Sequence, residues 1–190
     1  MMNAVKTTVA ALTVTAFAGT ASADADLNVV ENAAGSPVFT TLVAAADAAG
    51  LVDYLSTPEY RFTIFAPTDA AFAALPEGTV ERLLMPENQD ELRSLVAAHV
   101  VPALIDFSTG EVAEDVGAPE GYTTGTVFVD DAIMQVDTLE GADLLIDMRS
   151  DMPMISTDIG TIEDAILLGD VIEASNGIIH TIDTVLTPAN

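Results

Sequence analysis

The chain has 190 residues, no cysteine and a formal net charge of −25 at pH 7, from 30 acidic and 5 basic residues. Phosphate backbones and anionic membrane surfaces are bound by clustered lysine and arginine, so this balance excludes nucleic acid as a partner. Without cysteine the chain forms no disulfide and carries no cysteine-linked lipid anchor, so its fold depends on an apolar core. The acidic surplus is interpreted as a solvated surface that keeps the protein dispersed, with cation capture as the alternative.

Residues 1–23 have the pattern of a secretory signal peptide. Lys6, the one lysine, precedes a run of apolar and small residues, and Ala21-Ser22-Ala23 has the small-x-small form of a cleavage site. The run is shorter than the roughly 20 residues that span a bilayer, and acids or prolines interrupt the later apolar runs. We therefore expect cleavage before Asp24 and one domain over residues 24–190, secreted or periplasmic, with no transmembrane anchor.

The first half of this domain is predicted to be mainly helical. Apolar residues in 37–55 recur at three- and four-residue spacing, which places them on one helical face, and Gly50 ends or interrupts that helix. The predicted inward residues are Val38, Leu42, Ala45, Ala46 and Ala49.

Residues 61–67 alternate and are rich in β-forming side chains, which predicts a strand that ends at its proline. Short helices are then expected over 70–75, with Thr68 and Asp69 as candidate caps, and over 79–85. A longer helix is predicted from Asn88 to His99, opened by a capping box between Asn88 and Glu91.

Beyond Pro102 the pattern changes to short alternating runs, which predict antiparallel strands. These runs are 122–129, 132–138, 143–148, 170–175 and 178–186. Asn176-Gly177 joins the last two, and we expect a type I′ hairpin turn there, with positive φ at both residues. Helices first and antiparallel strands later indicate an α+β domain.

No catalytic set is recognisable in the sequence. A nucleophilic hydrolase needs a positioned serine or cysteine, and the chain has neither cysteine nor a Gly-x-Ser-x-Gly turn. Its two histidines, His99 and His180, are expected to lie in apolar packing, since His180 shares a strand face with Ile178 and Ile182. The chain also lacks the Asp-x-Asp-x-Asp-Gly loop of a calcium site. We therefore expect no enzyme activity and no cofactor.

Three methionines form the one candidate metal site, Met148, Met152 and Met154. Thioethers are soft ligands that suit Cu(I) in an extracytoplasmic space. The alternative is a methionine-rich loop that packs on the core. Together with the acidic surplus, this cluster supports a second functional hypothesis: a periplasmic protein that binds a small molecule or a metal such as copper or calcium.

Two segments are similar to the signatures of the fasciclin family. FTIFAPTDAAFAALP, over residues 62–76, resembles the first signature, and NGIIHTIDTVLTP, over 176–188, resembles the second. Between them, LVAAHVVP at 95–102 stands in the place of the family's Tyr-His motif, and DTLEGADLLI at 137–146 resembles its Thr-Leu-x-Gly stretch. Order and spacing match over nearly all of 28–188, so the chain resembles a bacterial, secreted, single-domain member of this family.

The resemblance implies a wedge of β-strands with helices packed on it. It also implies a non-catalytic adhesion or interaction module that binds a protein or polysaccharide at the cell surface. The signature positions are expected to be structural first, with Asp69 capping the helix behind Pro67 and His180 packed inward. These positions are Pro67, Thr68, Asp69, His99, Asn176, Gly177, His180 and Asp183.

Two positions depart from the family pattern. Ala98 replaces the aromatic residue before His99, and Val171-Ile172 stands where the family has an Asp-Ile pair. Both positions are associated with cell-receptor binding in animal members of the family. We therefore expect a partner other than an integrin-like receptor.

Overall fold

The computed structural model describes residues 24–106, 111–113, 127–130, 133–149, 153–156 and 165–187. Its helices are α1 (Val29–Gly35), α2 (Thr40–Ala48), α3 (Val52–Leu55), α4 (Asp69–Ala73), α5 (Thr79–Leu83), the 3₁₀ helix η1 (Pro86–Asn88) and α6 (Gln89–Ala97). Its strands are β1 (Phe62–Pro67), β2 (Val100–Val101), β3 (Leu104–Asp106), β4 (Glu111–Ala113), β5 (Val127–Asp130), β6 (Ile133–Asp137), β7 (Asp143–Asp147), β8 (Met154–Ser156), β9 (Ala165–Ala174) and β10 (Gly177–Ile182). The predicted α+β class, with helices first and most strands later, is confirmed.

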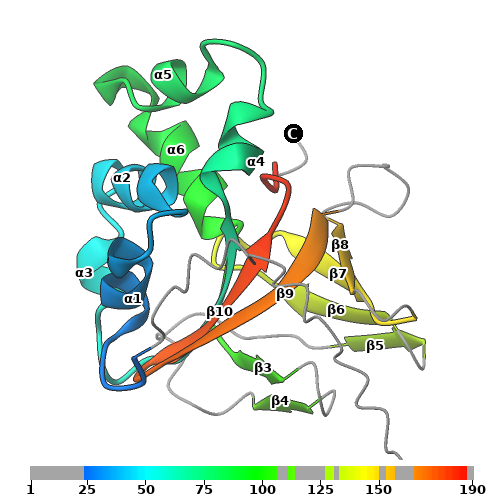
Figure 1. The fold of residues 1–190 in the computed structure, drawn as a ribbon. Helices are drawn as coiled ribbons and strands as arrows, with labels where there is room; N and C mark the ends of the chain where they lie inside the picture. Colours follow the sequence, from blue (N-terminus) through cyan, green and yellow to red (C-terminus); the bar gives the residue numbers. More distant parts are fainter. Residues whose placement is uncertain are drawn as a thin grey trace, which may run out of the picture.

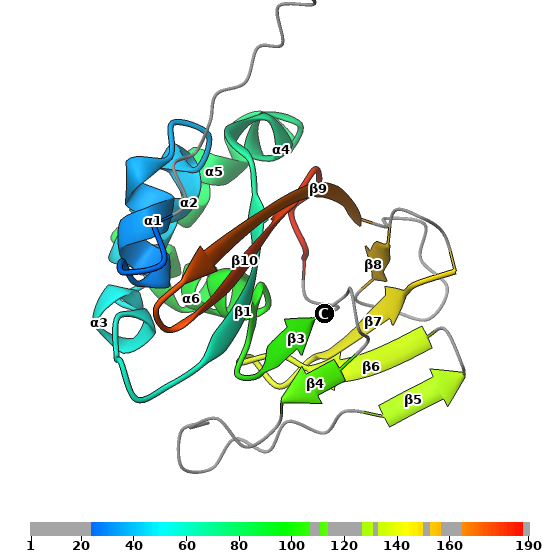
Figure 2. The same cartoon turned by 60° about the horizontal axis from the view of Figure 1, so that its bottom comes forward.

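Eight of the described strands form one sheet, in the order β2-β1-β10-β9-β8-β7-β6-β5, and β3 and β4 form a separate pair. The helices lie on one side of β1, β10 and β9, and β5 to β8 lie on the other (Figures 1 and 2). The strands of the second half pair antiparallel. β1 and β10 instead run parallel, with Phe62 opposite Gly177 and Pro67 opposite Ile182, a pairing that joins the two signature segments.

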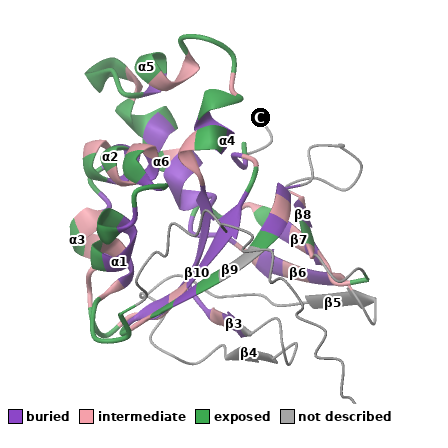
Figure 3. Ribbon diagram, in the orientation of Figure 1, coloured by how far each residue is buried: buried purple, intermediate pink, exposed green. Residues whose placement is uncertain are grey.

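β1 is buried along its whole length because apolar side chains pack on both of its faces. Ile64 belongs to the cluster that the helices form with the sheet, and Phe65 belongs to the cluster enclosed by β2, β3 and β6 to β8. β10 divides in the same way, with Ile179 in the first cluster and Ile182 in the second. Figure 3 shows this buried centre, while Glu81 and Arg82 of α5 are exposed. A strand covered on both faces is a near-continuous apolar run, as FTIFAP is.

The predicted helix over 37–55 is wrong at its start. α2 begins only at Thr40, so Val38 lies outside the helical repeat and is 40% exposed. Leu42, Ala45 and Ala46 point inward as expected. Gly50 has a φ of +69°, a left-handed conformation that suits glycine and separates α2 from α3.

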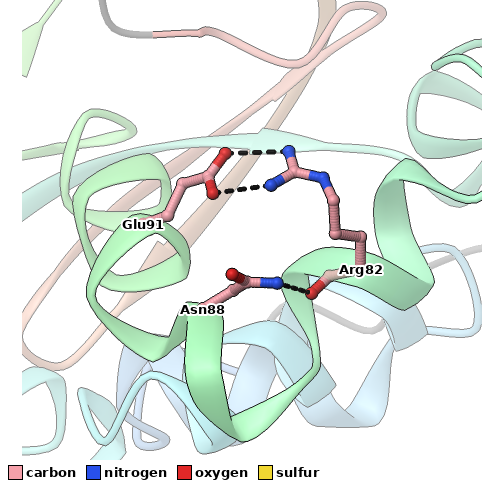
Figure 4. Close-up of polar contacts among 3 residues, drawn as sticks. All are labelled: Arg82, Asn88 and Glu91. Carbon is pink, nitrogen blue, oxygen red and sulfur yellow. Dashed lines mark hydrogen bonds and ion pairs between the residues drawn. The ribbon is translucent and has the colours of Figure 1, made fainter.

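The predicted capping box at the start of α6 is also wrong. The side chain of Asn88 does not cap this helix; its Nδ2 donates a hydrogen bond to the carbonyl of Arg82 at 2.6 Å. The Glu91 carboxylate instead forms a bidentate ion pair with Arg82, at 2.7 and 2.8 Å (Figure 4). A complete capping box occurs on α1, where Asn28 and Glu31 bond each other's main chain.

The turn between β9 and β10 is not of type I′. In the part of the chain that the structure describes, no residue other than glycine has a positive φ, and Gly177 is not among the glycines that do. The two loop residues are Ser175 and Asn176, because Ala174 pairs with Gly177. Of the other predicted strands, 132–138 and 143–148 correspond to β6 and β7, and residues 122–126 lie outside the described part.

Candidate functional site

Asn176 joins four parts of the fold through its side chain and its own carbonyl. Its Oδ1 accepts a hydrogen bond from the N–H of Val29 at 2.9 Å, and its Nδ2 donates to the carbonyls of Leu55 and Thr57 at 2.8 and 3.3 Å. Its own carbonyl accepts from the N–H of Phe62 at 3.1 Å. The residue is only 1% exposed. Since a buried amide without partners costs free energy, these bonds make Asn176 a fixed joint between α1, α3, β1 and β10.

Gly177 is required by a close approach rather than by its φ. A Cβ placed on this residue would lie 2.3 Å from the carbonyl oxygen of Phe62 and 3.0 Å from a methyl of Val29. Such a contact with backbone is shorter than real Cβ atoms make. Only glycine therefore allows β10 to begin directly against β1.

The side chain of Asp69 caps the start of α2, although Asp69 is itself the first residue of α4. Its carboxylate accepts hydrogen bonds from the N–H of Thr41 at 2.8 Å and the hydroxyl of Thr40 at 2.7 Å. Phe39, the N-cap residue of α2, provides no side-chain cap, so Asp69 supplies the missing acceptor from a distant segment. Burial opposes ionisation, but the bonds from Thr41 and Thr40 outweigh it and hold the pKa of Asp69 below its usual value.

Of the two candidate caps Thr68 and Asp69, Thr68 caps α4. Its Oγ1 accepts from the N–H of Ala71 at 3.3 Å, and its own N–H donates to the carbonyl of Ile182 at 3.3 Å. Pro67 precedes it as the last residue of β1. The Pro67-Thr68-Asp69 motif therefore ends a central strand, begins α4 and caps α2 within three residues.

His99 is buried directly beyond α6, with 1% of its surface exposed. Nδ1 lies 2.8 Å from the carbonyl of Leu95, and Nε2 lies 2.9 Å from the N–H of Leu186. Because the carbonyl can only accept and the amide can only donate, the ring is neutral with its proton on Nδ1. Burial lowers the pKa of His99 to about 4, although the bond to Leu95 opposes this shift.

The remaining signature residues lie along β10 and just beyond it. The ring of His180 is stacked on that of Phe65, with centroids 6.0 Å apart and planes at 27°, and His180 is 5% exposed. Asp183 bonds the start of β9, since its Oδ1 accepts from the N–H of Ile166 at 2.8 Å. Both residues thus contact neighbouring elements of the sheet rather than a shared cleft.

Thr63 has a structural role that sequence reasoning missed. It is fully buried in β1, where its Oγ1 donates to the carbonyl of Ala103 at 2.7 Å and accepts from the N–H of Ile105 at 2.9 Å. The signal was a threonine within an otherwise apolar run, because a buried hydroxyl needs partners.

The structure separates the candidate copper ligands that it describes. Asp147 pairs with Met154 across β7 and β8, so Met148, one residue further on, faces the opposite side of this ladder. Met148 packs on the buried cluster between the strands, whereas Met154 is 36% exposed. Met152 lies outside the described residues. Nor do the described ranges contain a group of three or more His, Cys, Asp or Glu side chains that could hold a metal ion.

The two departures from the family pattern have opposite surroundings. Ala98 is fully buried, whereas Val171 is 51% exposed on β9, opposite His180.

A small apolar cavity of about 30 Å³ lies between the helices and β1, with His99 as its one polar lining residue. Ligand pockets commonly have volumes of about 300–1,000 Å³, so this cavity is too small for a typical ligand in this conformation.

These observations define an α+β protein in which the polar side chains of the signature segments form hydrogen bonds within the fold. A sequence profile described as the Fasciclin domain matches residues 37–188. The chain therefore belongs to the fasciclin domain family, which confirms the resemblance found in the sequence.

Curated relatives and solved structures agree with this family. The chain is 40% identical to Protein sll1483 of Synechocystis sp. over 171 residues, which cover 88% of this chain and 77% of that one. It is 30% identical over 162 residues to the cell surface glycolipoprotein MPB83 of Mycobacterium bovis, covering 82% of this chain and 58% of that one. A FAS1 domain pair from the insect cell adhesion molecule fasciclin I matches with a TM-score of 0.63 at 16% identity, covering 84% of this chain and 50% of that one. This last likeness shows the fold alone.

None of the helices in the described ranges is long and apolar enough to cross a membrane.

Proposed function

We propose that this protein is an extracytoplasmic, non-catalytic interaction module that binds a protein or polysaccharide at the cell surface. The main support for the proposal is that the signature side chains bond groups of the fold itself. Asn176, Asp69 and His99 are all occupied by main-chain groups within the fold, so they serve as a frame and not as a reactive centre. Family membership supports the same conclusion, and the relative MPB83 is described as a cell surface glycolipoprotein.

The acidic surface of this protein favours a partner whose binding surface is positively charged. The chain carries 30 acidic residues. Of its few arginines, Arg82 pairs with Glu91, Arg149 lies 3.5 Å from Asp147, and Arg61 donates to the carbonyls of Pro58 and Tyr60. The acidic surface therefore repels acidic polysaccharides and attracts basic protein surfaces, and added salt weakens that attraction.

Adhesion of living cells tests the proposal. A deletion strain is compared with strains that carry the intact gene or the gene without codons 2–23. The intact gene should restore surface attachment, and crosslinking in these cells should recover a partner. The leaderless gene should restore neither. Unchanged attachment in the deletion strain together with no crosslinked partner would refute the proposal.

The second hypothesis is a periplasmic carrier of a small molecule or of copper or calcium. The structure argues against copper as the cargo, because Met148 and Met154 face opposite sides of the β7–β8 ladder. Native mass spectrometry of the exported protein separates the hypotheses. An interaction module should show the mass of the chain alone, whereas a carrier should retain a stoichiometric ligand or metal.

A further inference from the structure

The side chain of Asn176 and the main-chain nitrogen of Gly177 are the two groups that react when an asparagine deamidates. The nitrogen loses its proton and attacks Cγ, a five-membered succinimide ring closes, and Nδ2 takes up a proton and leaves as ammonia. Water then opens the ring at either carbonyl, which gives aspartate or isoaspartate. Glycine favours ring closure because it has no Cβ and adopts a wide range of backbone conformations. Asn176-Gly177 is the one Asn-Gly dipeptide in the sequence.

In the folded protein both reacting groups are held by neighbouring elements. Oδ1 of Asn176 accepts from the N–H of Val29 at 2.9 Å, and Nδ2 donates to two carbonyls at and beyond the end of α3, at 2.8 and 3.3 Å. The carbonyl of Asn176 accepts from the N–H of Phe62 at 3.1 Å, and Gly177 is packed on the Phe62 carbonyl. Ring closure brings Cγ onto the nitrogen of Gly177 and releases Nδ2, so it breaks these bonds of the carboxamide. Asn176 is also only 1% exposed, which keeps water from the site.

We propose that Asn176 is a modification site that the folded protein protects and that opening of the β9–β10 hairpin exposes. Opening releases the carboxamide from α1 and α3 and gives Gly177 the freedom that ring closure needs. Ring closure is slow compared with the opening and closing of a hairpin, so the rate of modification is proportional to the fraction of open chains.

The reaction also makes the opening irreversible. Aspartate replaces the donor Nδ2 with a charged oxygen that faces the carbonyls of Leu55 and Thr57, and a buried charge without partners is costly. Isoaspartate in addition places one more carbon atom in the main chain, where β10 begins against β1. A chain with isoaspartate therefore does not re-form the hairpin. The lifetime of the folded protein is limited by how often this hairpin opens.

The protection is tested by incubating the purified protein at mildly alkaline pH, with and without enough guanidinium chloride to unfold it. Peptide mass spectrometry follows the replacement of NH by oxygen at Asn176, and isoaspartate methyltransferase labels the isoaspartate. Deamidation should be at least about a hundredfold slower in the folded protein. Unfolded Gly177→Ala is the chemical control and should react more slowly than the unfolded wild type. Similar rates in the folded and unfolded wild type, or no reaction at Asn176 in the unfolded chain, would overturn the proposal.

Val29→Pro tests whether the bonds of the carboxamide protect Asn176. Val29 is the first residue of α1 and follows an extended Asn28, so proline is tolerated there, but proline has no N–H for Oδ1. Val29→Ala is the matched control, because it loses the isopropyl group beside Gly177 and keeps the N–H. In native buffer Val29→Pro should deamidate at Asn176 about three- to tenfold faster than Val29→Ala, the effect of one lost hydrogen bond. Equal rates would contradict protection by these bonds.

Refolding of modified chains tests the irreversibility and depends on neither variant. Unfolded wild-type protein is incubated until part of it carries isoaspartate at Asn176, and it is then diluted into native buffer and treated with a protease. Chains that resist digestion should contain unmodified Asn176, and the isoaspartate should be found in the digested fraction. Isoaspartate in equal proportion in both fractions would show that the modification does not trap the chain, against the proposal.

Discussion

The Nε2 atom of His99 accepts a hydrogen bond from the N–H of Leu186, 87 residues further along the chain. This bond joins the end of α6 to the segment that follows β10. It requires an unprotonated Nε2, because a protonated imidazole would direct a second donor at the donor of Leu186. The attachment of the last described segment therefore depends on the charge of one buried ring.

We predict that His99 makes the folded protein less stable as the pH falls below neutral. Its pKa is about 4 in the folded state and about 6.5 in the unfolded state, so the unfolded chain takes up the proton first. The stability from neutral His99 is present above pH 6.5 and is lost between about pH 6.5 and 4, by roughly 3 kcal/mol in total. Urea unfolding at several pH values measures it.

His99→Gln isolates this contribution, because the carboxylates titrate in both proteins. The variant should be less stable at pH 7, by about 1–3 kcal/mol, because a glutamine amide that accepts from Leu186 leaves the carbonyl of Leu95 without its donor. Its deficit relative to the wild type should shrink as the pH falls towards 4. A deficit that stays constant from pH 7.5 to 4 would contradict the assigned pKa.

Gly177→Ala is expected to destabilise the protein by about 1–3 kcal/mol, because its Cβ would meet the carbonyl of Phe62 and separate β1 from β10. Gly35→Ala provides a matched control. Nothing lies within 4 Å of a Cβ at Gly35, and its φ is not positive, so alanine should be neutral or slightly stabilising at the end of α1. Thermal unfolding of both variants measures the contrast, and equal effects would exclude close approach as the reason for Gly177.

Asp69→Ala should destabilise the protein by about 1–2 kcal/mol, because the N–H of Thr41 and the hydroxyl of Thr40 lose their acceptor. The lowered pKa of Asp69 means that its contribution is present above about pH 4 and is lost at lower pH. Asp47→Ala, on the exposed face of α2, serves as control and should change stability by less than about 0.5 kcal/mol. Chemical denaturation at pH 7 and pH 3 compares them.

Local sequence patterns predicted those helices and strands that nearby residues determine. The Phe62–Pro67 strand follows from its β-forming run and its proline. α6 follows from its apolar face, although it ends at Ala97 and not at His99 as predicted. Asn88 and Glu91 had the spacing of a capping box, but Arg82 bonds both of them instead. A three-residue pattern does not show that a cation of the preceding helix lies within reach.

The sequence singled out Asn176 and Asp69, but local patterns could not predict the partners of these residues. Asn176 bonds Val29 across 147 positions of the chain, and Asp69 bonds Thr41 across 28. The dipeptide Asn176-Gly177 favours a type I′ turn in isolation. Here the buried amide and the contact of Gly177 with Phe62 determine its backbone, and such tertiary contacts override local turn preference.

Asn176→Asp is expected to be destabilising at neutral pH and to recover in acid. Its carboxylate would keep an acceptor for the N–H of Val29 but would direct a second charged oxygen at the carbonyls of Leu55 and Thr57. Burial beside these carbonyls raises the pKa of the new carboxyl in the folded state, and the protonated form regains a donor for Leu55. We therefore expect a loss of about 2–4 kcal/mol at pH 7 that shrinks as the pH falls towards 4. Urea unfolding of Asn176→Asp and of the control Asn28→Asp measures this dependence, since Oδ1 of Asn28 accepts from Val30 and Glu31 and a carboxylate can keep both bonds. A loss that grows in acid would mean that the Asn176 amide does not donate to these carbonyls.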